Sequence, residues 1–187
     1  PTRLGDLAPL PASYHATLDA GLVALGLTLE PAARSAIDAH VRFLLAWTGA
    51  INLTAIREPA DAALLYVLDS LTAVPPLTAL GIDRLLDIGS GGGFPGLPLA
   101  VTLGTDRALL VDSVGKKTRF LQTVVEAIGM GQRIAAEQAR SETLAHDQRV
   151  YRSAKLVGQA ARGRDDFQRD LAEHAVALFG HREDAGH

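Results

Sequence analysis

Four glycines lie within five positions of a segment that runs from Asp87 to Gly96 and reads Asp-Ile-Gly-Ser-Gly-Gly-Gly-Phe-Pro-Gly. Glycines let the backbone turn sharply and let a ligand approach where a Cβ atom would otherwise intrude. The helical pattern that follows offers free backbone N–H groups at its N-terminus. The segment follows a short apolar run, so Asp87 is expected at a strand end. There its carboxylate could hold a cationic or hydroxyl-rich ligand near the loop.

A second acidic residue narrows the class of ligand. Leu109 to Asp112 is another apolar run that ends in a carboxylate, and Asp112 lies about twenty residues beyond the loop, the distance of a ribose-binding acid. The two features together indicate an adenosine-containing cofactor. The loop fits S-adenosylmethionine, which has an amino-acid tail and no phosphate. A dinucleotide stays open, because Gly91 to Gly96 can be aligned with Gly-x-Gly-x-x-Gly, although Phe94 and Pro95 then face the pyrophosphate.

Strands that alternate with helices around the loop predict a parallel sheet with right-handed crossovers. Three helices are expected before it, because apolar residues recur at helical spacing between glycine and proline breaks. The expected helices are 13–26, 31–49, 59–75, 95–103 and 116–128, and the expected strands are 85–88, 108–112 and 133–136.

The alternation stops after about Glu142. Residues 151–161 and 167–179 are predicted to be helices, and the second places Phe167, Leu171 and Leu178 on one face. No fourth strand is predicted, which would leave the first strand as an unprotected edge. Helices of the tail, or a second copy in a dimer, could cover that edge.

Composition limits the class of protein. The chain has 187 residues, of which 48% are hydrophobic, enough for one domain with a helical extension. It has no cysteine, which fits a reducing cytosol and excludes thiolate metal sites. Its histidines are scattered, so no metal site is expected. A net charge of −3 does not indicate a general nucleic-acid binder. No leader or apolar run of membrane-spanning length is recognised, so a cytoplasmic protein is expected.

Several segments, taken in order, resemble one known family, the bacterial ribosomal RNA small-subunit methyltransferase G family, also called glucose-inhibited division protein B. The resemblance covers roughly residues 30–145 and is specific because the segments occur together. They are Asn52-Leu53-Thr54-Ala55-Ile56-Arg57, Leu68-Asp69-Ser70, the glycine loop through Pro98, Asp112-Ser113 with Gly115-Lys116-Lys117 and Arg119-Phe120-Leu121, and Gln138 to Glu142.

The resemblance implies a Rossmann-like class I methyltransferase fold of the α/β class and S-adenosylmethionine-dependent methylation of guanine N7 in 16S ribosomal RNA. Three parts are expected: an N-terminal helical extension (1–80), a cofactor-binding Rossmann-like half (81–145) and an atypical, helical tail (146–187). The C-terminal half of the sheet would be missing or replaced by helices. The partner would be the RNA or the small ribosomal subunit, with no membrane, and the family implies a monomer.

The resemblance also implies which residues bind the cofactor. Gly89 and Phe94 match loop positions that contact it, and Gly91 and Gly93 would allow close approach of its methionine part. Asp112 would bind the ribose hydroxyls. The remaining residues carried over are Ser113 beside Asp112, and Ser141 and Glu142, which match a pair near the adenine. No catalytic side chain is assigned, because the lone pair of guanine N7 needs no general base and catalysis would rest on alignment.

Three cations open the helix after the second strand: Lys116, Lys117 and Arg119. They oppose the helix dipole, so we interpret them as RNA phosphate contacts, with a solvated basic turn as the alternative. The chain departs from the family at Leu65 and Tyr66, where the family usually has Arg-His, and after residue 145.

Two other functions stay open. A module that has lost its C-terminal strands could bind S-adenosylmethionine or the ribosome without catalysis. A small dinucleotide-dependent oxidoreductase fits the motifs less well.

Overall fold

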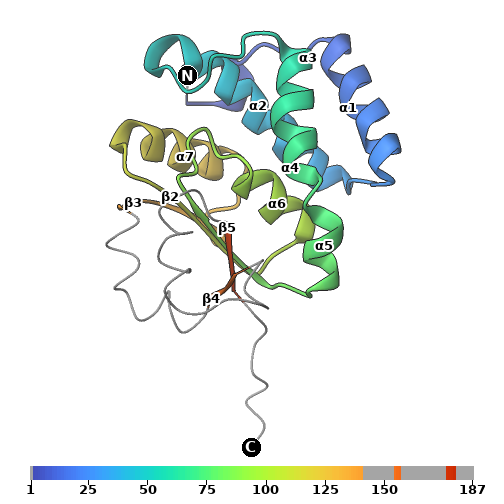
Figure 1. The fold of residues 1–187 in the computed structure, drawn as a ribbon. Coiled ribbons are helices and arrows are strands. Elements are labelled where there is room, and N and C mark those ends of the chain that lie inside the picture. Colours follow the sequence, from blue (N-terminus) through green and yellow to red (C-terminus); the bar gives the residue numbers. More distant parts are fainter. Residues whose placement is uncertain (1, 141–153, 157–175, 180–187) are drawn as a thin grey trace, which may run out of the picture.

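A computed structural model describes residues 2–140, 154–156 and 176–179 of the chain. In this part, a layer of N-terminal helices packs on two further helices, and these two cover one face of a β-sheet (Figure 1). The three strands predicted around the glycine loop are all present, and so are the helices between them.

The N-terminal segment is helical, as predicted. Helix α1 (Ala12–Leu25) ends where Gly26 takes the left-handed conformation with φ 64°. Helix α2 (Pro31–Ile51) continues past its predicted end at Gly49 and stops at Asn52, also left-handed with φ 51°. The other elements of this segment are η1 (Leu4–Asp6), α3 (Pro59–Ala62), the π-helical η2 (Ala63–Leu68), α4 (Asp69–Leu71) and α5 (Val74–Ala79).

The third predicted helix is a nearly continuous run, and the prolines expected to end it instead open its last part. Pro75 and Pro76 lie in the first turn of α5, where proline costs no hydrogen bond. The run Pro59–Ala79 is long and apolar enough to span a membrane, with a mean hydropathy of 1.4, which corrects the expectation that no such run exists. Ala63 and Val67 are fully buried against other helices, so this run is a core helix.

Three parallel strands form the centre of the sheet. Strand β1 (Arg84–Ile88) pairs with β2 (Arg107–Asp112), which pairs with β3 (Ile134–Gln138). Helix α6 (Gly96–Leu103) connects β1 to β2, and α7 (Gly115–Ala127) connects β2 to β3. Because the strands are parallel, the glycine loop after β1 and Asp112 at the end of β2 reach the same edge of the sheet.

Two further strands correct the predicted tail. Strand β5 (Val176–Phe179) pairs antiparallel with β1, and β4 (Ala154–Leu156) pairs antiparallel with β5, so the order is β3-β2-β1-β5-β4. Both lie in segments predicted to be helices, and those predictions are wrong at these residues. The edge of β1 is covered by β5, so the reason for a dimer through that edge no longer holds.

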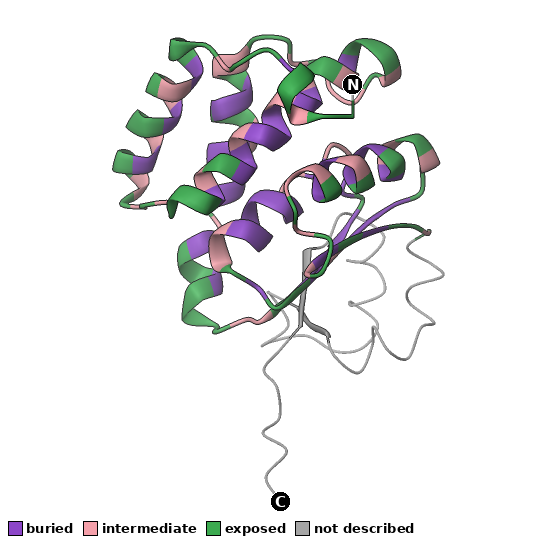
Figure 2. Cartoon of the chain, turned by 180° about the vertical axis from the view of Figure 1, so that it is seen from behind, coloured by how far each residue is buried: buried purple, intermediate pink, exposed green. Residues whose placement is uncertain are grey.

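The core lies between the helical layer and the sheet (Figure 2). Helix α2 contacts both α6 and α7, and the ring of Trp47 on α2 lies 5.6 Å, centroid to centroid, from that of Phe120 on α7. Helix α1 packs closely on η2 because Gly21 has no side chain. A Cβ atom at Gly21 would overlap the side chain of Leu68.

Candidate cofactor site

The glycine loop connects the end of β1 to the start of α6 and is fastened to β2. The backbone amides of Gly89 and Ser90 donate to the carbonyl of Val111, at 2.8 and 2.9 Å. Gly89, Gly91 and Gly93 have positive φ angles of 81°, 56° and 93°, which residues with a Cβ atom rarely adopt. The sequence therefore needs glycine at these three positions for the backbone path itself.

The loop has an open side and a packed side. A Cβ atom at Gly89 would meet nothing within 4 Å, and one at Gly91 would meet only the Gly89 carbonyl at 3.7 Å. In contrast, a Cβ atom at Gly92 would lie 2.8 Å from Leu44, and one at Gly93 would lie 2.8 Å from His40. A ligand can therefore approach the backbone at Gly89 and Gly91. Gly93, predicted to lie beside the ligand, faces the protein interior.

Asp112 joins the end of β2 to the loop. Its Oδ2 accepts a hydrogen bond from the Gly91 amide at 2.9 Å, and its Oδ1 accepts one from the Val114 amide at 2.8 Å. The Lys117 ammonium lies 3.8 Å from Oδ2. Only 5% of Asp112 is exposed. A carboxylate has about four acceptor sites, so Asp112 keeps capacity for hydroxyl groups of a ligand.

Asp87 lies beneath the loop and not on its open side. Its carboxylate is buried and accepts a hydrogen bond from the amide of Gly96, the first residue of α6, at 3.0 Å. Burial raises the pKa of Asp87 to about 6, and the bond from Gly96 limits the rise. Asp87 thus supports the start of α6, which corrects the expectation that it holds a ligand.

Phe94 stacks with two aromatic rings from the helical layer. The imidazole of His40 on α2 stacks on it with ring centroids 4.3 Å apart and an interplanar angle of 17°. The ring of Tyr66 on η2 also stacks on it, at 5.0 Å and 23°. Phe94 therefore links the loop to two helices that are distant in sequence.

Three predicted site residues remain, of which one lies at the end of β2 and two lie outside the described residues. Ser113 is exposed beside Asp112, and its carbonyl accepts a bond from the Gln138 side chain at 3.0 Å. Ser141 and Glu142 lie outside the described residues. Within those residues there is no group of His, Asp and Glu side chains that could hold a metal ion, and the sequence has no cysteine.

The cations at the start of α7 do not form a uniform group. Lys116 and Arg119 are exposed, whereas Lys117 is partly buried next to Asp112. Of the three cations, Lys116 and Arg119 are therefore the exposed ones, and Lys117 is the one that lies beside the Asp112 carboxylate.

Comparison with known proteins decides the family. The family model described as rRNA small subunit methyltransferase G matches residues 33–154, about two thirds of the chain. The chain belongs to this family. A ribosomal RNA small subunit methyltransferase G of Burkholderia pseudomallei is 39% identical over 172 residues, which cover 90% of this chain and 72% of that protein.

Other members of the methyltransferase G family match over shorter stretches. The protein from Cupriavidus metallidurans is 44% identical over 119 residues, covering 59% of this chain and 51% of the relative. The protein from Stenotrophomonas maltophilia is 42% identical over 136 residues, covering 73% and 61%. The chain thus spans about half to six tenths of the length of these curated relatives.

Sequence reasoning missed His40, which no motif singles out among the apolar stripe of α2. It lies fully buried against the loop, and burial lowers its pKa to about 4. Tyr66 drew attention only as a departure from the methyltransferase G pattern. Its neighbour Leu65 is about half exposed.

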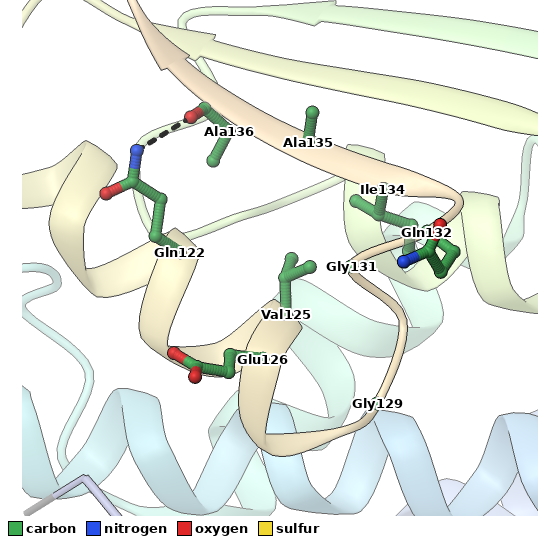
Figure 3. Close-up of a pocket in the computed structure, with 9 residues that line it drawn as sticks. All are labelled: Gln122, Val125, Glu126, Gly129, Gly131, Gln132, Ile134, Ala135 and Ala136. Carbon is green, nitrogen blue, oxygen red and sulfur yellow. Dashed lines mark hydrogen bonds between the residues drawn. The ribbon is translucent and has the colours of Figure 1, made fainter.

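A shallow, mostly apolar groove of about 370 Å³ lies away from this site (Figure 3). It is formed by the C-terminal half of α7, the turn after it and β3, and Gln122 at one end donates to the Ala136 carbonyl at 3.0 Å. It does not include the glycine loop or Asp112.

Proposed function

We propose that this chain is an S-adenosylmethionine-dependent methyltransferase that acts on guanine N7 of 16S ribosomal RNA. Membership of the methyltransferase G family supports the reaction and the substrate. The observation that carries the proposal for this chain is the meeting of the open glycine loop with Asp112 at the end of β2. Loops and acids at this edge of a parallel sheet bind adenosine cofactors.

The residues present fit the cofactor. Gly89 and Gly91 leave room for its methionine part against the loop backbone. The free acceptor sites of Asp112 suit the ribose hydroxyls, with Ser113 beside them. Ser141 and Glu142 would approach the adenine, and Phe94 would contribute its backbone or ring edge.

Bound S-adenosylmethionine supplies an activated methyl group. The residues of this chain bind and orient it and keep water away, and no side chain is needed to remove a proton, since N7 presents a free lone pair. Alignment of two bound partners can supply much of such a rate enhancement. The proposal therefore assigns positioning roles to the site residues and no general base.

The RNA would approach beside the start of α7. Lys116 and Arg119 are exposed there, next to the edge that carries the loop, and suit phosphate contacts. We further propose a cytoplasmic protein with the three parts 1–80, 81–145 and 146–187. The described strands β4 and β5 fall in the last part.

The test is calorimetric titration of the chain with S-adenosylmethionine, with NAD as the control ligand, followed by methyl transfer to unmethylated small subunits. We expect binding of the first ligand only, then transfer. Binding without transfer would favour a non-catalytic module. Binding of NAD would favour the oxidoreductase.

A further inference from the structure

Two aromatic rings of the helical layer stack on the Phe94 ring. The ring centroids of His40 and Tyr66 lie 4.3 and 5.0 Å from that of Phe94, and both rings are nearly parallel to it. Phe94 thus connects the glycine loop to the helical layer.

His40 also holds the loop by its backbone. Its Nε2 lies 2.6 Å from the carbonyl oxygen of Gly92. A carbonyl only accepts, so Nε2 carries the proton and donates it, and Nδ1 is an unprotonated nitrogen. Nδ1 is buried without a hydrogen-bond partner among the described residues. Burying a nitrogen without a hydrogen-bond partner costs free energy, and an apolar side chain would avoid that cost. Burial alone therefore does not favour histidine at this position.

The second ring is anchored as well. The Tyr66 hydroxyl is hydrogen-bonded to Oγ1 of Thr54, which also accepts the amide of Ile56 at 2.9 Å. The stack therefore runs from the segment after α2, through Tyr66 and Phe94, to His40 on α2.

We propose that His40 and Tyr66 are positioning residues that hold the glycine loop in its ligand-binding shape, by clamping Phe94 and by the bond from His40 to Gly92. This inference rests on the proposed cofactor site, because a positioning role requires a ligand at the loop. A loop ordered beforehand spares the ligand the entropic cost of ordering it. We call the contacts of His40 and Tyr66 with Phe94 and Gly92 the clamp. Substitutions that weaken the clamp should therefore weaken ligand binding without removing a ligand contact.

Amide hydrogen exchange without any ligand tests the clamp directly. The Gly91 and Gly93 amides are hydrogen-bonded, to Asp112 and to the Ser90 carbonyl. His40→Phe keeps a ring but cannot donate a hydrogen bond to the Gly92 carbonyl. It should raise the exchange rates of both amides about three- to tenfold, the factor that corresponds to the loss of one hydrogen bond. His40→Leu should raise it further. Tyr66→Ala should also raise it, and Tyr66→Phe, which keeps the ring but loses the hydrogen bond to Thr54, should raise it less than Tyr66→Ala does.

Leu77→Ala is the matched control, since Leu77 is buried on α5, which contacts α6 and precedes the end of β1 opposite to the loop. This substitution lowers stability outside the stack of His40, Phe94 and Tyr66, so the ratio of the loop amide exchange rates to that of the Leu110 amide in β2 should not change. Equal ratios in the wild type, His40→Leu and Tyr66→Ala would overturn the proposal.

Calorimetry with S-adenosylmethionine gives the second measurement. His40→Phe should bind about three- to tenfold more weakly, and Tyr66→Phe should lose less affinity than Tyr66→Ala. Faster exchange with unchanged affinity would overturn the positioning role. A wild type that does not bind, with faster loop exchange in the variants, would remove the proposed function and leave the clamp standing.

Discussion

The amide of Gly91 donates to the carboxylate of Asp112 across 2.9 Å, and this bond joins the two features that the sequence shows about twenty residues apart. The loop and the acid are therefore one unit and not two neighbouring contacts. A change at either residue should alter both the stability of the fold and the affinity for the cofactor.

Asp112→Asn tests this coupling. Asparagine has one acceptor oxygen, so it cannot accept from both Gly91 and Val114 in the present geometry. One buried donor is left unpaired, and we expect the free energy of unfolding to fall by about 1–3 kcal/mol. Urea denaturation measures this, and calorimetry should show at least roughly tenfold weaker binding of S-adenosylmethionine, the loss of a hydrogen bond to a charged group.

The control is Asp61→Asn on α3, an exposed residue, which should change stability by less than about 0.5 kcal/mol. Equal urea midpoints for the Asp112 and Asp61 variants would contradict the coupling.

Gly96→Ala should destabilise the fold. The added Cβ atom would lie 2.5 Å from Leu110 and would overlap the Asp87 carboxylate, so α6 must move away from the sheet. Overpacking of this kind costs about 1–3 kcal/mol. Gly131→Ala is the matched control, because a Cβ atom there meets nothing within 4 Å. Thermal or urea unfolding measures both variants. Unfolding midpoints that fall equally in Gly96→Ala and Gly131→Ala would show that close packing at Gly96 is not the cause.

Two buried groups should make stability depend on pH in opposite directions. Burial raises the pKa of Asp87 to about 6, so the folded chain keeps a proton that the unfolded chain releases. This contribution is present below about pH 4 and is lost as the pH rises through 6. Burial lowers the pKa of His40 to about 4, so its contribution is present above 6.5 and is lost as the pH falls through 4.

Single variants should separate the two slopes. Between pH 4 and 6.5, Asp87→Asn should gain stability relative to the wild type as the pH rises, and His40→Phe should lose it, each on the order of 2–3 kcal/mol. Urea midpoints across this range give the measurement. Curves for both variants that run parallel to the wild type would contradict the assignment.

The local elements could be predicted because their signals are local. Gly26 and Gly104 end α1 and α6 in the left-handed conformation, and apolar runs that end in Asp112 or precede the glycine loop mark β2 and β1. The register of loop and acid also follows from sequence, since parallel strands end at one edge.

The rest depends on contacts between distant residues. Val176–Phe179 is a short apolar run, which periodicity cannot assign to helix or strand, and pairing with β1 decides it. The stack of His40, Tyr66 and Phe94 joins three separate segments. The sequence places His40 among apolar neighbours on α2, and nothing local indicates the loop above it.

Charge reversal at the start of α7 tests the proposed RNA contact. Lys116→Glu combined with Arg119→Glu should weaken binding to small subunits and reduce the slope of log affinity against log salt by about 1 for each lost phosphate contact. Lys117 is left unchanged because it lies 3.8 Å from Asp112 and its loss would disturb the cofactor site. Arg84→Glu is the control, since Arg84 is exposed at the opposite end of β1 from the loop. Binding titrations at several salt concentrations measure both slopes. A slope equal to that of the wild type, with cofactor binding intact, would show that the RNA approaches another face.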